Sequence, residues 1–287
     1  MESTAVKLDN KRSLQSWFSP LVILLTIAIG FFIYTFILGD CSHFQACPEG
    51  VTDCVCSDNH PMPGDYFAIV YKGGVIIPFA IGLFLMMIVF SIERFITISK
   101  ATGKSSIDVF VKKIQLHLNN NQIEEAIALC DQQRGSIANV TKAALEKYHE
   151  MSGEKSLDRE QKVVAIQKEI EEATTLELPM LERNLVIIAT IVSIGTLIGL
   201  IGTVLGMIKA FSALATAGSP DAVALANGIS EALVNTALGI TTSTIATIAY
   251  NYFTSSIDAL TYRIDESGFS IVQTFASRHN TSGEAIK

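Results

Sequence analysis

The stretch NGISEALVNTALGITTSTIATIAY, residues 227–250, decides the fold of this chain. It is long and apolar enough to cross a bilayer as a helix, which takes about 20 residues. It nevertheless carries a carboxylate, Glu231, close to one end. An acid in the hydrocarbon core costs about 2.5–3.5 kcal/mol on insertion scales, so such residues face protein or a wet path. We therefore expect a membrane-spanning helix whose acid faces other protein.

Polar side chains line one side of this predicted helix. Glu231, Asn235 and Thr242 lie at i, i+4 and i+11, which form one stripe of an α-helix, and Thr236 lies beside the stripe. Such a stripe favours a path for a small cation, with Asn235 and Thr242 placed on it by geometry alone. The alternative is that Glu231 is a structural acid, hydrogen-bonded to Thr203 across a hairpin. We favour the path because of the cost of an acid in a membrane.

The composition of the whole chain is that of a membrane protein. Its 287 residues are 49% hydrophobic with a mean hydropathy of +0.39, and the apolar residues gather in blocks. The net charge of −7 offers no basic surface for nucleic acid. No nucleophile–base or metal motif occurs either. We expect an all-α polytopic membrane protein with four transmembrane helices and a helical cytoplasmic domain, without enzymatic activity, cofactor or metal.

Four apolar runs predict the four spans. The first has a basic flank like a signal peptide, but its length and the lack of a small-residue cleavage site indicate an uncleaved helix. The loop after it lacks Lys and Arg, so the positive-inside rule places that loop outside and both termini in the cytoplasm. The expected boundaries are 1–17 cytoplasmic, 18–38 span, 39–65 periplasmic loop, 66–92 span, 93–184 cytoplasmic helical domain, 185–211 span, 212–222 periplasmic turn, 223–250 span, and 251–287 cytoplasmic helix and tail.

The third span carries glycines on one side, which would let another helix backbone approach closely. The glycines are Gly195, Gly199, Gly202 and Gly206. The short turn between this span and the fourth predicts an antiparallel helical hairpin. Nearly all Lys and Arg residues lie in the segments predicted to be cytoplasmic. Lys209, near the end of the third span, is an exception and is expected to extend its ammonium group toward the membrane surface.

Four cysteines lie in the loop after the first span, at Cys41, Cys47, Cys54 and Cys56. Clustered cysteines in a non-cytosolic loop favour two structural disulfides. Four cysteines allow three pairings, which stay open, although Cys54 and Cys56 are too close in sequence to pair with each other. A metal site with the neighbouring histidines is the weaker alternative because the ligand spacing is scattered.

Motifs of the predicted hairpin resemble the ExbB/TolQ/MotA proton-channel superfamily, and ExbB most closely. They are GTVLG at 202–206 and ISEAL at 229–233, followed by NTALGI at 235–240. Glu93 and Arg94, at the end of the second span, also fit the pattern. The similarity covers about residues 70–260. It implies that Thr203, Glu231 and Thr236 belong to a proton pathway.

The resemblance further implies a homo-oligomeric ring, typically a pentamer, in the bacterial inner membrane. The ring would surround two helices of an ExbD-like single-span partner and energise a TonB-like protein for transport at the outer membrane. A TolQ-like subunit, or a flagellar or gliding stator subunit, is the alternative. A secondary solute transporter is disfavoured by the lack of inverted repeats, and a purely structural scaffold is the third hypothesis. The first span and its cysteine loop are absent from the three-span ExbB pattern, so the resemblance does not cover residues 1–64.

Overall fold

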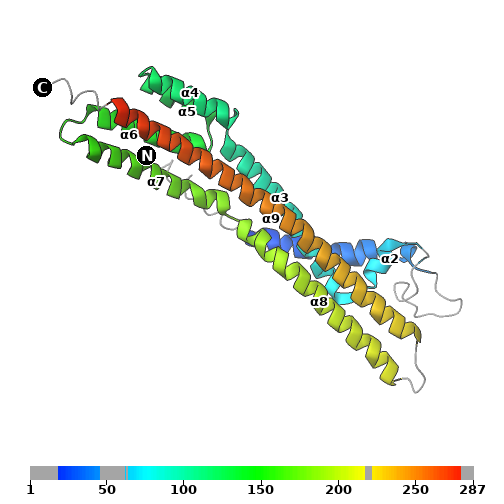
Figure 1. Cartoon of the computed structure of the whole chain (residues 1–287). Helices are drawn as coiled ribbons and strands as arrows, with labels where there is room; N and C mark the ends of the chain where they lie inside the picture. Colours follow the sequence, from blue (N-terminus) through cyan, green and yellow to red (C-terminus); the bar gives the residue numbers. More distant parts are fainter. Residues whose placement is uncertain (1–18, 46–61, 63, 217–221, 279–287) are drawn as a thin grey trace, which may run out of the picture. The chain divides into compact units, whose positions relative to one another are not determined.

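The computed structural model describes residues 19–45, 62, 64–216 and 222–278 (Figure 1). These residues are helical apart from short connections, which confirms the all-α class. Four helices are long and apolar enough to cross a membrane, as predicted, and lie within Ser19–Leu38 (the N-terminal helix), Gly74–Asn119, Arg159–Ala215 and Ala222–Arg278. Cys41 is disulfide-bonded. The other disulfide candidates, Cys47, Cys54 and Cys56, lie outside the described residues, as do 1–17 and 217–221.

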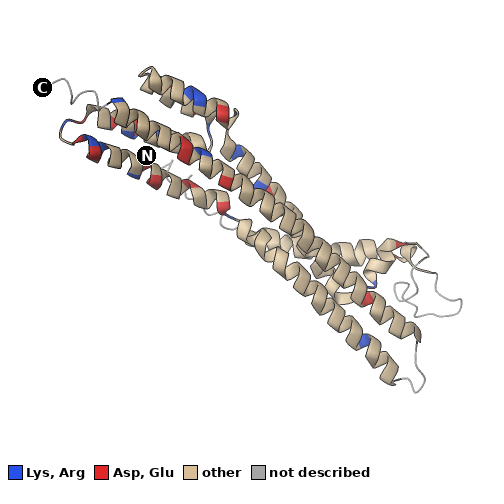
Figure 2. Ribbon diagram, viewed as in Figure 1, with Lys and Arg blue, Asp and Glu red and all other residues tan. Residues whose placement is uncertain are grey.

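The helices follow one another in simple order. After the N-terminal helix, whose last turn is the π-helix η1, the elements are η1 (Ile33–Leu38), η2 (Cys41–His43), α2 (Tyr66–Tyr71), η4 (Gly74–Ile76), α3 (Ile77–Thr102), α4 (Ile107–Asn119), α5 (Ile123–Gln133), α6 (Ser136–Gly153), α7 (Arg159–Glu182), α8 (Leu185–Thr216) and α9 (Ala222–Arg278). The chain divides into an apolar unit, Met1–Ser91 with Val186–Tyr250, and a polar unit, Ile92–Leu185 with Asn251–Lys287. Charged residues concentrate on α4 to α7 and are sparse on α8 (Figure 2).

Within the apolar unit, the region expected as a single span at 66–92 contains a break. Helix α2 ends at Tyr71, and a turn at Gly73 and Gly74 separates it from α3. We call these two residues the double-glycine turn. Gly74 has φ +77°, a left-handed conformation that glycine adopts without strain. Pro78 lies in the first turn of α3, where its missing N–H leaves no helical hydrogen bond unmade.

The N-terminal helix packs closely on α3. A Cβ on Gly30 would lie 2.9 Å from the Gly82 nitrogen, and a Cβ on Gly82 would lie 3.1 Å from the Ile27 Cα. Such approaches exclude any side chain at the crossing point. In η1, the Tyr34 ring stacks on Tyr71 of α2 with centroids 4.6 Å apart. The N-terminal helix is therefore fixed to both helical pieces that flank the double-glycine turn.

The polar unit has its own hydrophobic core, in which the Tyr148 and Phe275 rings meet edge to face at 4.9 Å. The connection at 120–122 separates α4 from α5, and the connection at 154–158 separates α6 from α7. The lone Cys130 is buried, and burial raises the pKa of its thiol to about 12. It is therefore a packing residue, because the reactive thiolate is not formed near neutral pH.

Helix α7 lies directly before the predicted third span. It contains Pro179 but ends at Glu182, and Asn184, with φ +62°, separates it from α8. Arg94 of α3 stabilises this end of α7 by donating to the Leu181 carbonyl at 3.0 Å. Cationic side chains at a helix carboxyl end satisfy its last carbonyls in this way.

The Glu93 and Arg94 pair belongs to this junction. Arg94 is 2% exposed, and its Nε donates to Glu93 Oε2 at 2.7 Å. The same Glu93 oxygen accepts from Asn184 Nδ2 at 3.3 Å. The two charges therefore pair with each other, within the packed junction of α3 with the end of α7.

We predict that Arg94→Met destabilises the protein by about 1–3 kcal/mol, because the change removes the side-chain donor to the Leu181 carbonyl and the positive charge that pairs with Glu93. The control is Lys168→Met on α7, where an exposed lysine forms a 3.5 Å ion pair with Glu172. Such surface pairs contribute less than about 1 kcal/mol. Thermal unfolding in detergent, followed by circular dichroism, measures both. Equal losses in the two variants would contradict the structural role of Arg94.

Candidate functional site

Helices α8 and α9 approach so closely that their backbones touch. A Cβ on Gly239 of α9 would lie 2.6 Å from the Gly195 carbonyl oxygen and 2.7 Å from the Gly199 Cα. A Cβ on Gly206 would lie 2.8 Å from the Ala232 nitrogen. The helix that covers the glycine face is thus α9 of the same chain. All four glycines singled out from the sequence face it: Gly195, Gly199, Gly202 and Gly206.

Hydroxyl groups connect α8 and α9 along this contact. The Thr203 and Thr236 hydroxyls hydrogen-bond to each other. Each hydroxyl also has a carbonyl acceptor on its own helix, Gly199 at 3.0 Å from Thr203 Oγ1 and Ala232 at 3.1 Å from Thr236 Oγ1, so either hydroxyl can be the donor of the pair. Farther along, Thr196 donates to Ser243 at 2.8 Å. The sequence interpretation brought Thr203 and Thr236 into the site by resemblance but missed the second hydroxyl pair.

The residues of the predicted polar stripe have different neighbours. Asn235 is 1% exposed, and its Nδ2 donates to the Gly73 carbonyl at 2.8 Å. Its Oδ1 is buried without a hydrogen-bond partner among the described residues. Thr242 is also buried, but it bonds to its own helix at the Leu238 carbonyl, 2.9 Å away. Asn235 thus connects α9 to the double-glycine turn, whereas the Thr242 hydroxyl forms its hydrogen bond within α9.

Glu231 forms an ion pair with Lys209 of α8. Its Oε2 lies 2.8 Å from the Lys209 Nζ, and the two side chains are 14% and 70% exposed, respectively. They are the only charged residues of α8 and of the described part of α9 up to Tyr250. The alternative in which Glu231 hydrogen-bonds Thr203 is not what the structure contains, because Thr203 bonds Thr236 instead.

The sequence interpretation missed Lys209 as the partner of the acid, although a signal for it exists. Lys209 and Glu231 lie equally far along the chain from residue 220. In an antiparallel hairpin, residues equidistant from the connection lie opposite each other. Pairing also lowers the cost of two charges in an apolar environment. Opposite charges at matching positions in two consecutive spans are therefore a pattern to search for.

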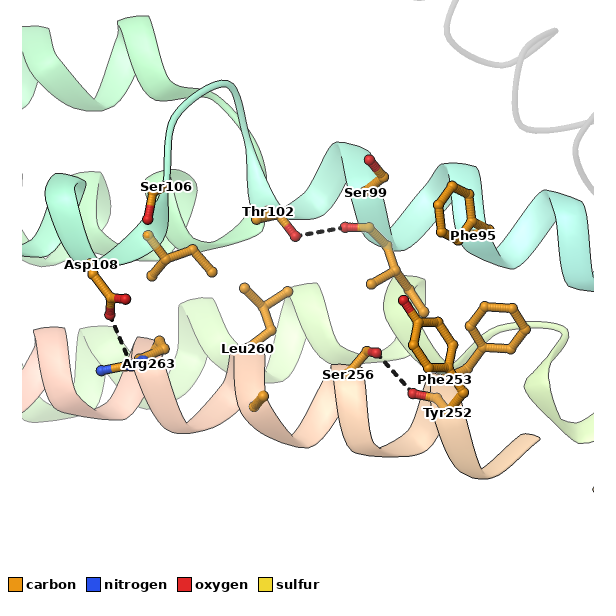
Figure 3. A pocket seen from close by; sticks show the side chains of 13 residues that line it. Phe95, Ser99, Thr102, Ser106, Asp108, Tyr252, Phe253, Ser256, Leu260 and Arg263 are labelled. Atoms are coloured by element: carbon orange, nitrogen blue, oxygen red, sulfur yellow. Dashed lines mark hydrogen bonds and ion pairs between the residues drawn. The ribbon is translucent and has the colours of Figure 1, made fainter. Parts of the chain in front are cut away.

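Grooves lie along these helices in both units. In the polar unit a groove of about 540 Å³ lies between α3, the start of α4 and α9 (Figure 3). At one end of it Asp108 pairs with Arg263 at 2.8 Å, and Arg263 also bonds Glu266. In the apolar unit an open groove of about 630 Å³ runs along α8, lined by apolar side chains together with Thr203 and Ser212.

The fold and the site together define a class of protein: a helical membrane protein with one ion pair and two hydrogen-bonded hydroxyl pairs in a tightly packed hairpin. Residues 132–266 match the MotA/TolQ/ExbB proton channel family. This range includes Thr203, Lys209, Glu231 and Thr236. Through this domain the chain is a member of the ExbB/TolQ/MotA superfamily, which confirms the resemblance seen in its motifs.

Several curated proteins are similar to parts of the chain. A putative biopolymer transport protein, ExbB-like 3, from Synechocystis sp. is 38% identical over 88 residues, 30% of this chain and 42% of that protein. The Tol-Pal system protein TolQ of Pseudomonas aeruginosa is 25% identical over 158 residues, 55% and 68% of the two chains. The biopolymer transport protein ExbB of Xanthomonas campestris pv. campestris is 28% identical over 112 residues, 39% and 44%. Two of these alignments thus span less than half of the relative.

We predict that Gly239→Ala weakens the hairpin by about 1–3 kcal/mol, because the added methyl group meets backbone atoms of Gly195 and Gly199 that cannot rotate away. Gly153→Ala is the matched control, since a Cβ there meets nothing within 4 Å. Retention of the folded protein after heating in detergent, measured by size-exclusion chromatography, compares the two. A Gly239→Ala protein as heat-resistant as the control would exclude the close contact.

Proposed function

We propose that this chain is the ExbB-like subunit of a proton-motive-force-driven complex in the bacterial inner membrane, with both termini in the cytoplasm. Several copies, five in the typical arrangement of the family, surround the helices of an ExbD-like single-span partner. Proton passage then energises a TonB-like protein and transport at the outer membrane. The chain acts as a transport component and not as an enzyme. The sequence similarity to ExbB and TolQ proteins supports this proposal.

The observation that carries the proposal is the isolation of the Glu231 and Lys209 pair. No other charge occurs in α8 or in the described part of α9 up to Tyr250, and the acid is 14% exposed. Ionisable residues in membrane segments mark ion and proton pathways because their burial is costly. Lys209 offers the carboxylate a partner that a proton, or the protonated carboxyl group of a second acid, replaces when the pair opens. The hydroxyls of Thr203 and Thr236 lie farther along the same hairpin and are able to relay hydrogen bonds.

One chain does not provide a complete proton path. Its hairpin holds a single acid, so a second carboxylate has to come from the partner helix. The groove along α8 is a suitable docking surface, because Leu200, Val204 and Phe211 are more than half exposed along it. Thr203 lies in the same groove, next to where a partner helix would run.

The energy available sets a requirement on this mechanism. One charge that crosses 100 mV releases about 2.3 kcal/mol, so mechanical work on an outer-membrane receptor needs several protons. A ring of identical subunits around a central partner meets this need, because each subunit presents one Glu231 to the partner in turn. Protonation of the partner's acid beside Thr203, Glu231 and Thr236 would let the central helices turn against the ring.

The second candidate is a TolQ-like subunit of a Tol-Pal type system. It is favoured by the length of the match to the Pseudomonas aeruginosa TolQ, which spans 68% of that protein. The two functions share the same site chemistry and differ in the protein that is energised. Expression in bacteria that lack either exbB or tolQ separates them, because rescue of energised uptake supports the first and rescue of envelope integrity the second.

We predict that Glu231→Gln lowers proton flux at least tenfold in liposomes that hold the chain with its single-span partner. The amide keeps the size of the side chain but cannot exchange a proton, and tenfold corresponds to about 1.4 kcal/mol. Asp265→Asn is the control, because Asp265 is an exposed acid on the same helix α9 but in the polar unit. Flux is followed with a pH-sensitive dye inside the liposomes. Undiminished flux in Glu231→Gln would overturn the proposal.

A further inference from the structure

The Glu231 carboxylate lies against the double-glycine turn as well as against Lys209. Its Oε2 bonds Lys209, and its Oε1 contacts Gly74 of the double-glycine turn. A Cβ on Gly74 would overlap Oε1 and lie 3.0 Å from the carboxyl carbon, so no side chain fits between the turn and the acid. One oxygen of the acid thus bonds Lys209 of α8, and the other lies against the double-glycine turn.

The turn is held in this place from the side of α9. Asn235 lies one helical turn after Glu231, and its Nδ2 donates to the Gly73 carbonyl at 2.8 Å. Because Asn235 is 1% exposed, water does not compete for this hydrogen bond. A Cβ on Gly202 of α8 would overlap the Asn235 side chain, so α8 leaves Asn235 no room to turn away.

The turn is held from the other side by the N-terminal helix. Tyr34 of η1 stacks on Tyr71 and donates its hydroxyl to the Tyr71 carbonyl at 3.4 Å, two residues before Gly73. Phe44, which is 1% exposed, packs on the opposite edge of Tyr71 with centroids 5.5 Å apart. The N-terminal helix and the turn lie outside the part of the chain that matches the family, residues 132–266.

We propose that the double-glycine turn is a cover on Glu231 that the N-terminal helix sets in place, and that it limits the access of waterborne protons to the acid. Gly74 and Asn235 are positioning residues, and Tyr34 holds the turn through Tyr71. The extra helix of this chain thereby acts on Glu231 through the position of the turn. The proposal rests on the proposed function in one respect only, that Glu231 exchanges protons.

The test measures access to Glu231 directly rather than transport. Dicyclohexylcarbodiimide, which reacts with protonated carboxyl groups in apolar surroundings, is applied to membranes that contain the full-length chain with its partner. Mass spectrometry quantifies the modified peptide, and Glu231→Gln provides the blank. Gly74→Ala is compared with Gly64→Ala. Both glycines have a positive φ, +77° and +87°, but a Cβ on Gly64 meets nothing within 4 Å.

We expect Gly74→Ala to be labelled about tenfold faster than the wild type, equivalent to about 1.4 kcal/mol in the covered-to-uncovered equilibrium. Gly64→Ala carries the same backbone strain and should label at the wild-type rate. Tyr34→Leu, which removes the stack on Tyr71, should also label faster, and Tyr34→Phe, which keeps it, should not. If Gly74→Ala fails to fold, the comparison of the two tyrosine variants still tests the proposal.

Equal labelling of Gly74→Ala, Gly64→Ala and the wild type would overturn the cover, as would equal rates in Tyr34→Leu and Tyr34→Phe. Proton flux through the wild-type complex is measured on the same membranes. Flux without any difference in labelling rejects the cover and keeps the proposed function. Differential labelling without flux keeps the cover and rejects the proposed function.

Discussion

The contact between α8 and α9 is the constraint on which the rest of the apolar unit depends. Two helices can bring opposite charges together in an apolar environment only if their register is unambiguous. Gly195, Gly199 and Gly239 remove the side chains that would keep the backbones apart, so that main-chain atoms meet. This register places Lys209 opposite Glu231 and Thr203 opposite Thr236.

The same register explains how a costly group is tolerated. A lone carboxylate in an apolar environment is strongly destabilising, whereas a paired one loses much of that penalty. Lys209 is 70% exposed and has a long flexible stem, so the pair can open without unfolding the hairpin. The acid is therefore held closely and remains able to exchange partners.

The second span contributes to this site through the break between α2 and α3 and not through a regular helix. The break in the helix at Gly73 places the carbonyl of this residue where the Asn235 amide of α9 donates to it. Gly74 then approaches the acid in a conformation that only glycine adopts without strain. Because the N-terminal helix stacks on Tyr71 just before this break, a segment outside the family domain is connected to Glu231.

Periodicity and composition alone determined the all-α class, the four apolar spans and the side of α8 on which the glycines lie. They also identified Glu231 as an acid within an apolar span. These properties depend on residues near one another in the chain, and helical geometry places such residues reliably. Only the tertiary structure decided that Lys209 pairs with Glu231, that Asn235 binds the Gly73 carbonyl, and that Thr242 serves its own helix. The helical period determines which residues lie on the same face of a helix. What covers that face depends on the packing of segments far apart in the sequence, and on a helix break that no local pattern required.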